Sequence, residues 1–398
     1  MHTAAPPRPR APSIVLLGIA SSLSPFGVTI AVPALASIAS QFSADFGEVQ
    51  WVISAYLFGL GIAQPFNGFL CDRFGRRPVM LGGFTLFVAS SLAAAFSTSL
   101  AQLILLRLLQ AVGVSVGTVA SRAVIRDTHD ALGSTIALSW VSAIMGFAPI
   151  LAPVLGGLLG AQGGYSRIFL ASALLGAMVL CLLHLNLRET LQPEQARPRW
   201  SQWMKNYKHL LCSSRFLAYS LIFGFKQGSF FAFLAIGAVV FQNQFGIGQK
   251  QFGLIWGLMA FTYVAGAIIS AKMIRRYGQR PVMHLAIGAT LVAGWLIAWN
   301  STSGGPSLFG LLMPLAVMMA AAGTITPVAL AGAVNAHPEI AGTASGLSSA
   351  LGIVVGGSFT VLSGYIYADS FLPVALLIAF SVTMATAIWT GVSRLDSD

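Results

Sequence analysis

Charged side chains crowd one short stretch of this sequence, GFLCDRFGRRPVM at residues 68–80. They are Asp72, Arg73, Arg76 and Arg77. Charged residues make up only 8% of the chain, so this clustering is unusual. One carboxylate among three guanidinium groups suits ion pairing at a turn rather than catalysis. Gly75 permits a tight reversal, and Pro78 can begin the following helix at little cost.

Asp72 falls at the carboxyl end of its own predicted helix, where the helix macrodipole is unfavourable for an anion. We therefore expect Asp72 to pair with an arginine or with the amino terminus of another helix, as in a latch between elements. The alternative is that the three arginines only fix the orientation of the chain in a membrane.

Two further cations, Arg107 and Lys226, fall inside long apolar runs. A charged side chain within a membrane span is costly unless it faces the protein interior, so both are candidate functional groups. Arg107 is a candidate substrate-binding group, with a structural pairing to backbone carbonyls as the alternative. Lys226 can bind an anionic ligand, carry a proton, pair across a cavity or extend its amine toward the membrane surface.

The composition places these groups in a membrane protein. Hydrophobic residues make up 56% of the 398 residues, and the mean hydropathy is +0.80. These values exclude an ordinary soluble enzyme. A helix needs about 20 apolar residues to cross ~30 Å of hydrocarbon, so the uncharged run between Arg280 and Glu339 must hold two spans.

The apolar runs and their polar boundaries predict an all-α integral membrane protein with twelve transmembrane helices. The predicted helices are 13–36, 48–70, 78–97, 100–123, 133–160, 166–187, 216–241, 251–274, 281–299, 307–334, 340–366 and 370–392. The longest polar segment, 188–215, falls midway along the chain. It predicts a cytoplasmic linker between a bundle at 13–187 and a bundle at 216–392, with a segment 1–12 before them and a tail 393–398 after them.

The basic residues predict the orientation of the chain. All but four of the 22 Lys and Arg residues fall on one side of the predicted spans, the exceptions being Arg107, Arg167, Lys226 and Lys250. This asymmetry places both termini in the cytoplasm. The net charge of +11 is therefore explained by membrane topology, and no nucleic-acid partner is expected.

The charged turn has a second copy. Residues 72–80, DRFGRRPVM, align with residues 275–283, RRYGQRPVM. Arg276, Gly278 and Arg280 then correspond to Arg73, Gly75 and Arg77, whereas Arg275 replaces Asp72. This internal similarity indicates two duplicated six-helix units, whose two latches are not electrostatically equivalent.

Three segments resemble signatures of one transporter family. Residues 68–77, GFLCDRFGRR, match G-x-x-x-D-R-x-G-R-R of the turn after helix two. Residues 103–113, LILLRLLQAVG, resemble R-x-x-Q-x-x-G of helix four. Residues 148–157, APILAPVLGG, resemble the G-P-x-x-G-G antiporter signature, with Ala152 where the family usually has Gly. Over its whole length the chain resembles the drug:proton antiporter branch of the major facilitator superfamily, of the bicyclomycin and chloramphenicol resistance type.

The resemblance implies two pseudo-symmetric bundles that work by alternating access. The turns are then conformational latches, formed by Gly68, Asp72, Arg73, Gly75, Arg76, Arg77, Arg276, Gly278 and Arg280. The antiporter motif of Gly146, Pro149, Pro153, Gly156 and Gly157 closes the outer gate, and Arg107 couples proton movement to substrate release. We expect a monomer in a bacterial inner membrane.

One feature departs from the antiporter pattern. All eleven acidic residues lie at span ends or in loops. Relatives of the bicyclomycin type place a carboxylate in helix one, where this sequence has Thr29. Proton coupling through helix one is therefore in doubt. Two cations without an internal anion should repel cationic drugs and favour neutral or anionic ligands.

Aromatic and polar residues of the spans are further candidates for the substrate site, although aromatic side chains in spans commonly serve packing alone. The predicted substrate-binding residues are Phe26, Thr29, Tyr56, Arg107, Gln110, Lys226, Gln227, Phe230, Trp256 and Tyr263.

The first functional hypothesis is efflux of a small neutral or amphipathic drug-like compound by proton antiport. The alternative is export or exchange of an organic anion, with Lys226 and Arg107 as counter-charges. The sequence has no paired carboxylates, nucleophile with base or phosphate-binding loop, so we expect no enzyme and no cofactor. Its cysteines, Cys71, Cys181 and Cys212, have no metal-ligand spacing, so no metal site is expected.

Overall fold

The computed structural model describes residues 12–191, 200–302, 307–367 and 370–395. These residues form helices and their connections, with no strand among them. The first bundle holds α1 (Ile14–Ile30), α2 (Leu35–Phe42), α3 (Phe46–Val49), α4 (Trp51–Phe74), α5 (Arg76–Ala95), α6 (Leu100–Thr128) and α7 (Ala131–Asn186). Helix α8 (Trp200–Leu211) follows it. The second bundle holds α9 (Ser214–Phe245), α10 (Gln249–Tyr277), α11 (Gln279–Thr302), α12 (Leu308–Asn335), α13 (Ala341–Ile366) and α14 (Leu372–Leu395).

Eleven of these segments are long and apolar enough to cross a membrane, and one of them holds two spans. The span within α7 runs over 51 residues, which at 1.5 Å per residue is about 77 Å, more than twice the hydrocarbon thickness. Gly163 and Gly164 leave helical geometry in its middle, and Gly164 has a φ of 68°. The chain therefore reverses there, as the predicted boundary between 160 and 166 requires.

The first span differs from its prediction as one continuous helix over 13–36. Helix α1 ends at Ile30, a 3₁₀ turn covers Val32–Ala34, and α2 continues the span to Phe42. Pro33 lies at the start of that turn and has no amide hydrogen to continue the α-helical ladder. The proline thus breaks the span near its outer third.

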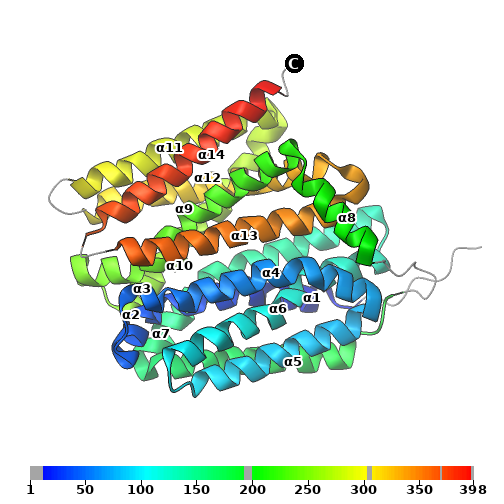
Figure 1. Cartoon of the computed structure of the whole chain (residues 1–398), viewed down its shortest axis with the longest axis horizontal. Coiled ribbons are helices and arrows are strands. Elements are labelled where there is room, and N and C mark those ends of the chain that lie inside the picture. Colours follow the sequence, from blue (N-terminus) through cyan, green and yellow to red (C-terminus); the bar gives the residue numbers. More distant parts are fainter. Residues whose placement is uncertain (1–11, 192–199, 303–306, 368–369, 396–398) are drawn as a thin grey trace, which may run out of the picture.

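The two bundles lie side by side, and they meet along α4 with α13 and along α7 with α10 (Figure 1). We call the end that carries the α4–α5 turn, α8 and the α10–α11 turn the basic end, and the other the opposite end. Small residues allow close helix contacts: a Cβ at Gly117 of α6 would meet the carbonyl oxygen of Ala20 in α1. The fold is thus the predicted pair of six-helix bundles.

The duplicated turn has the same backbone form in both bundles. Gly75 ends α4 with a φ of 101°, and Gly278 ends α10 with a φ of 86°. Residues other than glycine rarely adopt such values, which explains why both copies of the turn carry glycine at this position.

Candidate functional site

The charged turn at residues 68–77, the first latch, is organised around Arg76. This side chain is 5% exposed, and it donates to Asp127 of α6 at 2.9 Å and pairs with Asp72 at 3.0 Å. It also donates to the carbonyl oxygen of Cys71 at 2.9 Å. Arg76 is therefore buried between α4, α5 and α6, although it belongs to a turn.

Glu189, just after α7, caps the amino terminus of α5. Its two carboxylate oxygens accept from the backbone N–H groups of Arg76 and Arg77, at 2.9 and 3.1 Å. Arg77 donates in turn to the carbonyl oxygens of Leu187 and His184. An anion at a helix amino terminus is favourable, so the latch fastens the end of α7 to α5. Asp72, as expected, pairs with an arginine.

The second latch, at residues 275–283, is built differently. Its arginines Arg275, Arg276 and Arg280 are exposed, and Arg275 replaces the aspartate of the first copy. The turn geometry is therefore duplicated, whereas the arginines of the second copy are exposed instead of buried as Arg76 is.

We predict that Arg76→Ala destabilises the protein by about 3 kcal/mol, because it leaves the largely buried carboxylate of Asp127 without its cation. The midpoint of chemical unfolding in detergent measures this effect. Arg275→Ala, at the exposed second latch, is the control and should leave the midpoint unchanged. Equal midpoints for both variants would contradict the buried-pair interpretation.

Arg107 is fully buried inside the first bundle and joins three of its helices. Its guanidinium donates to the carbonyl oxygen of Gly27 in α1 at 2.8 Å and to that of Val52 in α4 at 3.0 Å. It also donates to Gln110 on its own helix, and Gln110 donates to Ser91 of α5 at 2.6 Å. The structural pairing with carbonyls that the sequence left open is thus present.

The face of the Tyr56 ring completes the surroundings of Arg107. The guanidinium carbon lies 4.0 Å from the centre of this ring, at the distance of a cation–π contact. The Tyr56 hydroxyl donates to Ser24 in α1 at 3.2 Å. Tyr56 and Arg107 therefore lie in helix packing rather than on a cavity wall.

Lys226 lies in the second bundle, twelve residues after the start of α9, or about 18 Å along the helix. It lines two adjoining cavities. The first is lined by Lys226, Ser229, Phe230, Phe233, Trp256, Thr290, Leu315, Met318, Met319 and Ala322. The second is lined by Lys226, Ile287, Thr290, Ile325, Val382, Ala385 and Thr386. Neither wall contains a carboxylate.

The Lys226 amine has an uncharged partner. It donates to the side-chain oxygen of Gln227 at 2.8 Å, and the amine lies 5.4 Å from the centre of the Phe230 ring. No carboxylate pairs with it among the residues that the structure describes. The cavities thus combine aromatic and methionine surface with three hydroxyls and one cation.

The antiporter motif of α7 lies against both bundles. A Cβ on Gly156 would meet the carbonyl oxygen of Ile30 in α1, so α7 and α1 touch backbone to backbone. On the other side, a Cβ on Gly253 of α10 would meet the carbonyl oxygen of Pro153. The motif therefore sits where the first bundle meets the second.

Hydrogen bonds also join the bundles at the opposite end. The amide of Gln50 donates to the carbonyl oxygen of Ala235 at 2.9 Å, and the Trp51 indole donates to the Tyr365 hydroxyl at 3.4 Å. The structure is thus a state in which the bundles are in contact at this end.

The sequence profile of the Major Facilitator Superfamily matches residues 17–361. The chain belongs to this superfamily. It is a multi-pass membrane transporter and not an enzyme, as the sequence predicted.

Curated relatives of this transporter span most of its length. It is 27% identical to a chloramphenicol resistance protein of Pseudomonas aeruginosa, over 95% of this chain and 89% of that protein. It is 29% identical to multidrug resistance protein D of Escherichia coli strain K12, over 88% of each chain. A bacterial homologue of the human lysosomal transporter Spinster, solved inward-facing and occupied, superposes with a TM-score of 0.75 at 14% identity, covering 96% of each chain.

The transporter brings only some of the predicted substrate residues to the cavities. Lys226, Phe230 and Trp256 line them. The other predicted residues, Phe26, Thr29, Tyr56, Arg107, Gln110, Gln227 and Tyr263, are not part of either wall. Phe26, Thr29 and Gln110 are buried within the first bundle.

Several lining residues were not predicted, although the sequence carried a signal for two of them. Ser229 and Phe233 follow Lys226 by three and seven positions, which places them on the same face of α9. Thr290, Met318 and Met319 come from other helices, and only tertiary structure brings them to this face.

Helix α8 lies in the predicted linker and crosses the basic end of the transporter (Figure 1). Trp200 packs edge-on against Phe69 of α4, with ring centres 5.2 Å apart, and Trp203 lies 5.4 Å from Phe66. Leu210, near the other end of α8, is fully buried in the core of the second bundle. The linker helix thus contacts both bundles.

Proposed function

We propose that this transporter exports a small neutral or amphipathic drug-like compound by proton antiport. The observation that carries the proposal is the Lys226 cavity, whose wall is mostly apolar and includes three aromatic and two methionine side chains. Such surfaces adapt to apolar ligands of varied shape, while Ser229 and Thr290 can hydrogen-bond a polar group. Relatives named for chloramphenicol and multidrug resistance support this substrate class.

We place the basic end in the cytoplasm of a bacterial cell, with both termini there and the protein in the inner membrane as a monomer. The concentration of arginines at the α4–α5 and α10–α11 turns supports this orientation. The opposite end, where the bundles are in contact, then faces outward, and we assign the structure to a stage of the proposed alternating-access cycle in which the outer side is closed.

For proton coupling we propose Lys226 ahead of Arg107. The guanidinium of Arg107 is held by three oxygen acceptors and stays charged in proteins. The Lys226 amine instead has one amide partner and borders the cavities, so fewer fixed contacts oppose the loss of its proton.

A second function is favoured by the same lysine. A cavity with one cation and no carboxylate suits an organic anion, whose carboxylate would form a charge-assisted hydrogen bond with Lys226. Removing that partner should weaken anion binding by about 10- to 100-fold, since such bonds contribute about 1.5–3 kcal/mol.

Proteoliposomes with a trapped pH dye separate the two functions. If drug antiport is correct, neutral amphipathic compounds evoke proton movement in the wild-type protein, and anions do not. We then expect Lys226→Met to abolish the proton signal while counterflow exchange of the neutral compound continues. Lys250→Met, which changes an exposed lysine near the start of α10, is the control.

The opposite pattern would replace the first proposal with the second. Transport selective for anions, with both transport and counterflow abolished by Lys226→Met, would identify an organic anion exporter. Proton movement with neutral compounds that Lys226→Met leaves unchanged would support antiport but overturn the assignment of Lys226 as proton carrier.

A further inference from the structure

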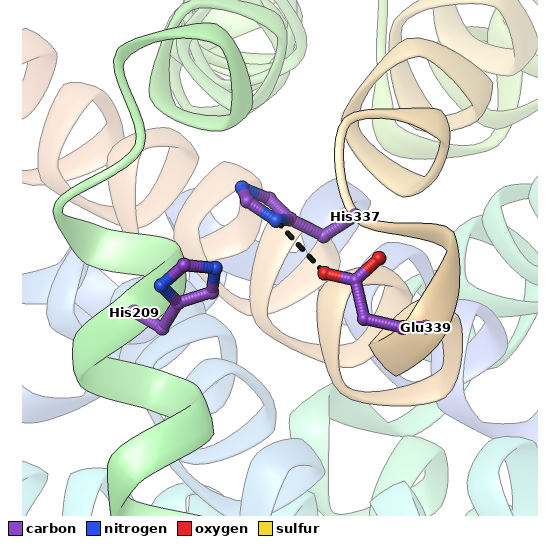
Figure 2. Close-up of side chains that lie close together, drawn as sticks. All are labelled: His209, His337 and Glu339. Carbon is purple, nitrogen blue, oxygen red and sulfur yellow. Dashed lines mark hydrogen bonds and ion pairs between the residues drawn. The ribbon is translucent and has the colours of Figure 1, made fainter.

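Two histidines and a glutamate from distant parts of the chain meet at the basic end. His209 belongs to α8, His337 follows α12, and Glu339 lies in the 3₁₀ turn Pro338–Ile340 that precedes α13. One possible ligand atom from each side chain can be chosen such that all lie within 4.8 Å of one another. Figure 2 shows the three side chains turned toward a common space between α8 and the turn.

The contacts within this cluster bring nitrogen and oxygen donors together. His337 Nδ1 lies 3.1 Å from Glu339 Oε1, and the His209 and His337 rings lie 4.6 Å apart between centres, nearly perpendicular. The Nε2 atom of His337 is buried, and no hydrogen-bond partner for it is found in the described part of the chain. The ring nitrogen that faces Glu339 is Nδ1, so Nδ1 is the His337 atom that can share a ligand with this carboxylate.

The backbone holds the cluster in place from both sides. The amide of Ile340 donates to the carbonyl oxygen of His337 at 3.2 Å, which closes the turn that sets Glu339 beside His337. On the other side Leu210, the neighbour of His209, is fully buried in the core of the second bundle, where Ile340 also packs. The three side chains therefore converge because the fold positions them.

We propose that His209, His337 and Glu339 bind a divalent transition-metal ion of the Zn²⁺ type. Two imidazoles and one carboxylate form a donor set that such ions favour, whereas Ca²⁺ and Mg²⁺ require oxygen ligands. His209 and Glu339 are exposed, so water can enter and take the remaining coordination position.

The required rearrangement is small. Tetrahedral bonds of about 2.1 Å place ligand atoms about 3.4 Å apart, so the widest separation in the cluster must shorten by about 1.4 Å. Rotation of the exposed His209 and Glu339 side chains can supply this movement.

A bound ion would have a consequence for the linker helix. It would fasten α8 to the α12–α13 turn of the second bundle, while Trp200 and Trp203 hold α8 against Phe66 and Phe69 of the first. The metal would thus secure one of the two contacts through which α8 joins the bundles, the one with the second bundle.

Cobalt(II) binding to the full-length protein in detergent, with any histidine tag removed, tests the proposal. We expect one equivalent of Co²⁺ to bind with the visible ligand-field bands of a tetrahedral site, and Zn²⁺ to displace it. His209→Ala and Glu339→Gln should each weaken binding by about tenfold or more. Both change exposed side chains, so folding should be retained.

His284→Ala is the matched control, because His284 is an exposed histidine of the second bundle near its basic end and outside the cluster. It should bind Co²⁺ as the wild type does. Zn²⁺ should also raise the unfolding midpoint of the wild type but not that of His209→Ala. Absence of a one-to-one Co²⁺ complex, or a complex that His209→Ala leaves intact, would overturn the proposal and leave the cluster as a proton-sharing contact.

Discussion

Arg107→Met should unfold or inactivate the transporter more severely than any other single change of a charged residue in its first bundle. The substitution keeps an unbranched side chain of similar reach but removes every donor. It leaves the carbonyl oxygen of Gly27 and the side-chain oxygen of Gln110 buried without the donor they now have. We expect a loss of about 3–5 kcal/mol in the free energy of unfolding, the range seen when one partner of a buried charged contact is removed.

The position of Gly27 explains why the effect should be large. Gly27 is among the last four residues of α1, whose carbonyl groups have no amide donor within the helix. Arg107 supplies that donor and also places a positive charge at the carboxyl end of the helix, where the macrodipole favours it. The same side chain fixes α4 through Val52. One residue therefore sets the relative positions of three helices.

The yield of folded protein in detergent and its unfolding midpoint measure this prediction. Arg107→Lys should fail nearly as badly, because one ammonium cannot reproduce the planar arrangement of guanidinium donors. Arg122→Met, an exposed arginine of the same helix, is the control. If Arg107→Met folds with wild-type stability and binds substrate without moving protons, the residue is a coupling residue and its structural role is minor.

The number and the approximate bounds of the spans were predictable, because each membrane-crossing helix requires an apolar run of about 20 residues. Each span is a run of apolar residues, and the reversal at Gly163 and Gly164 was marked by small residues in the predicted boundary. The break at Val32–Ala34 was missed, since Pro33 in an apolar run does not by itself distinguish a kink from the end of a helix.

The environments of the two internal cations were predictable only in part. Arg107 and Lys226 are both charged residues inside apolar runs, so hydropathy alone does not distinguish their roles. Their difference lies in their partners: Arg107 bonds to carbonyls 55 and 80 residues away, whereas Lys226 borders a cavity. Backbone acceptors have no sequence signature, because every residue carries a carbonyl group.

The cluster of His209, His337 and Glu339 could not be predicted from the sequence either. His209 and His337 are separated by most of the second bundle, and no short spacing connects them. Sequence motifs for metal sites depend on ligands that are close together along the chain. A site assembled by a linker helix and a distant turn becomes visible only in the folded structure.

Gly253→Val should abolish transport while leaving both bundles folded. Even the Cβ of an alanine at this position would meet the carbonyl oxygen of Pro153, which is backbone and cannot rotate away. Helices α7 and α10 must then move apart, and they form one of the two main contacts between the bundles. The next turn of α10 is also tightly packed, since a Cβ on Gly257 would lie 3.0 Å from the carbonyl oxygen of Ile150.

The substitution should act on the balance of conformations rather than on folding. In the proposed alternating-access cycle these backbones separate when the opposite end opens, so the clash should penalise the closed state described here. A penalty of about 5.5 kcal/mol is enough to change a 99:1 preference into 1:99. Alternating access needs both states, so substrate cycling should stop.

Labelling with a membrane-impermeant maleimide measures this shift. With the native cysteines replaced, a cysteine at Ile150 should be protected in the wild-type background and labelled from outside when Gly253→Val is added, because Ile150 is buried at the α7–α10 contact. Gly288→Val is the control, since a Cβ at this position meets nothing within 4 Å. Unchanged labelling with full transport would mean that α7 and α10 separate without cost. The antiporter motif would then serve helix packing within the first bundle and would not control opening at the opposite end.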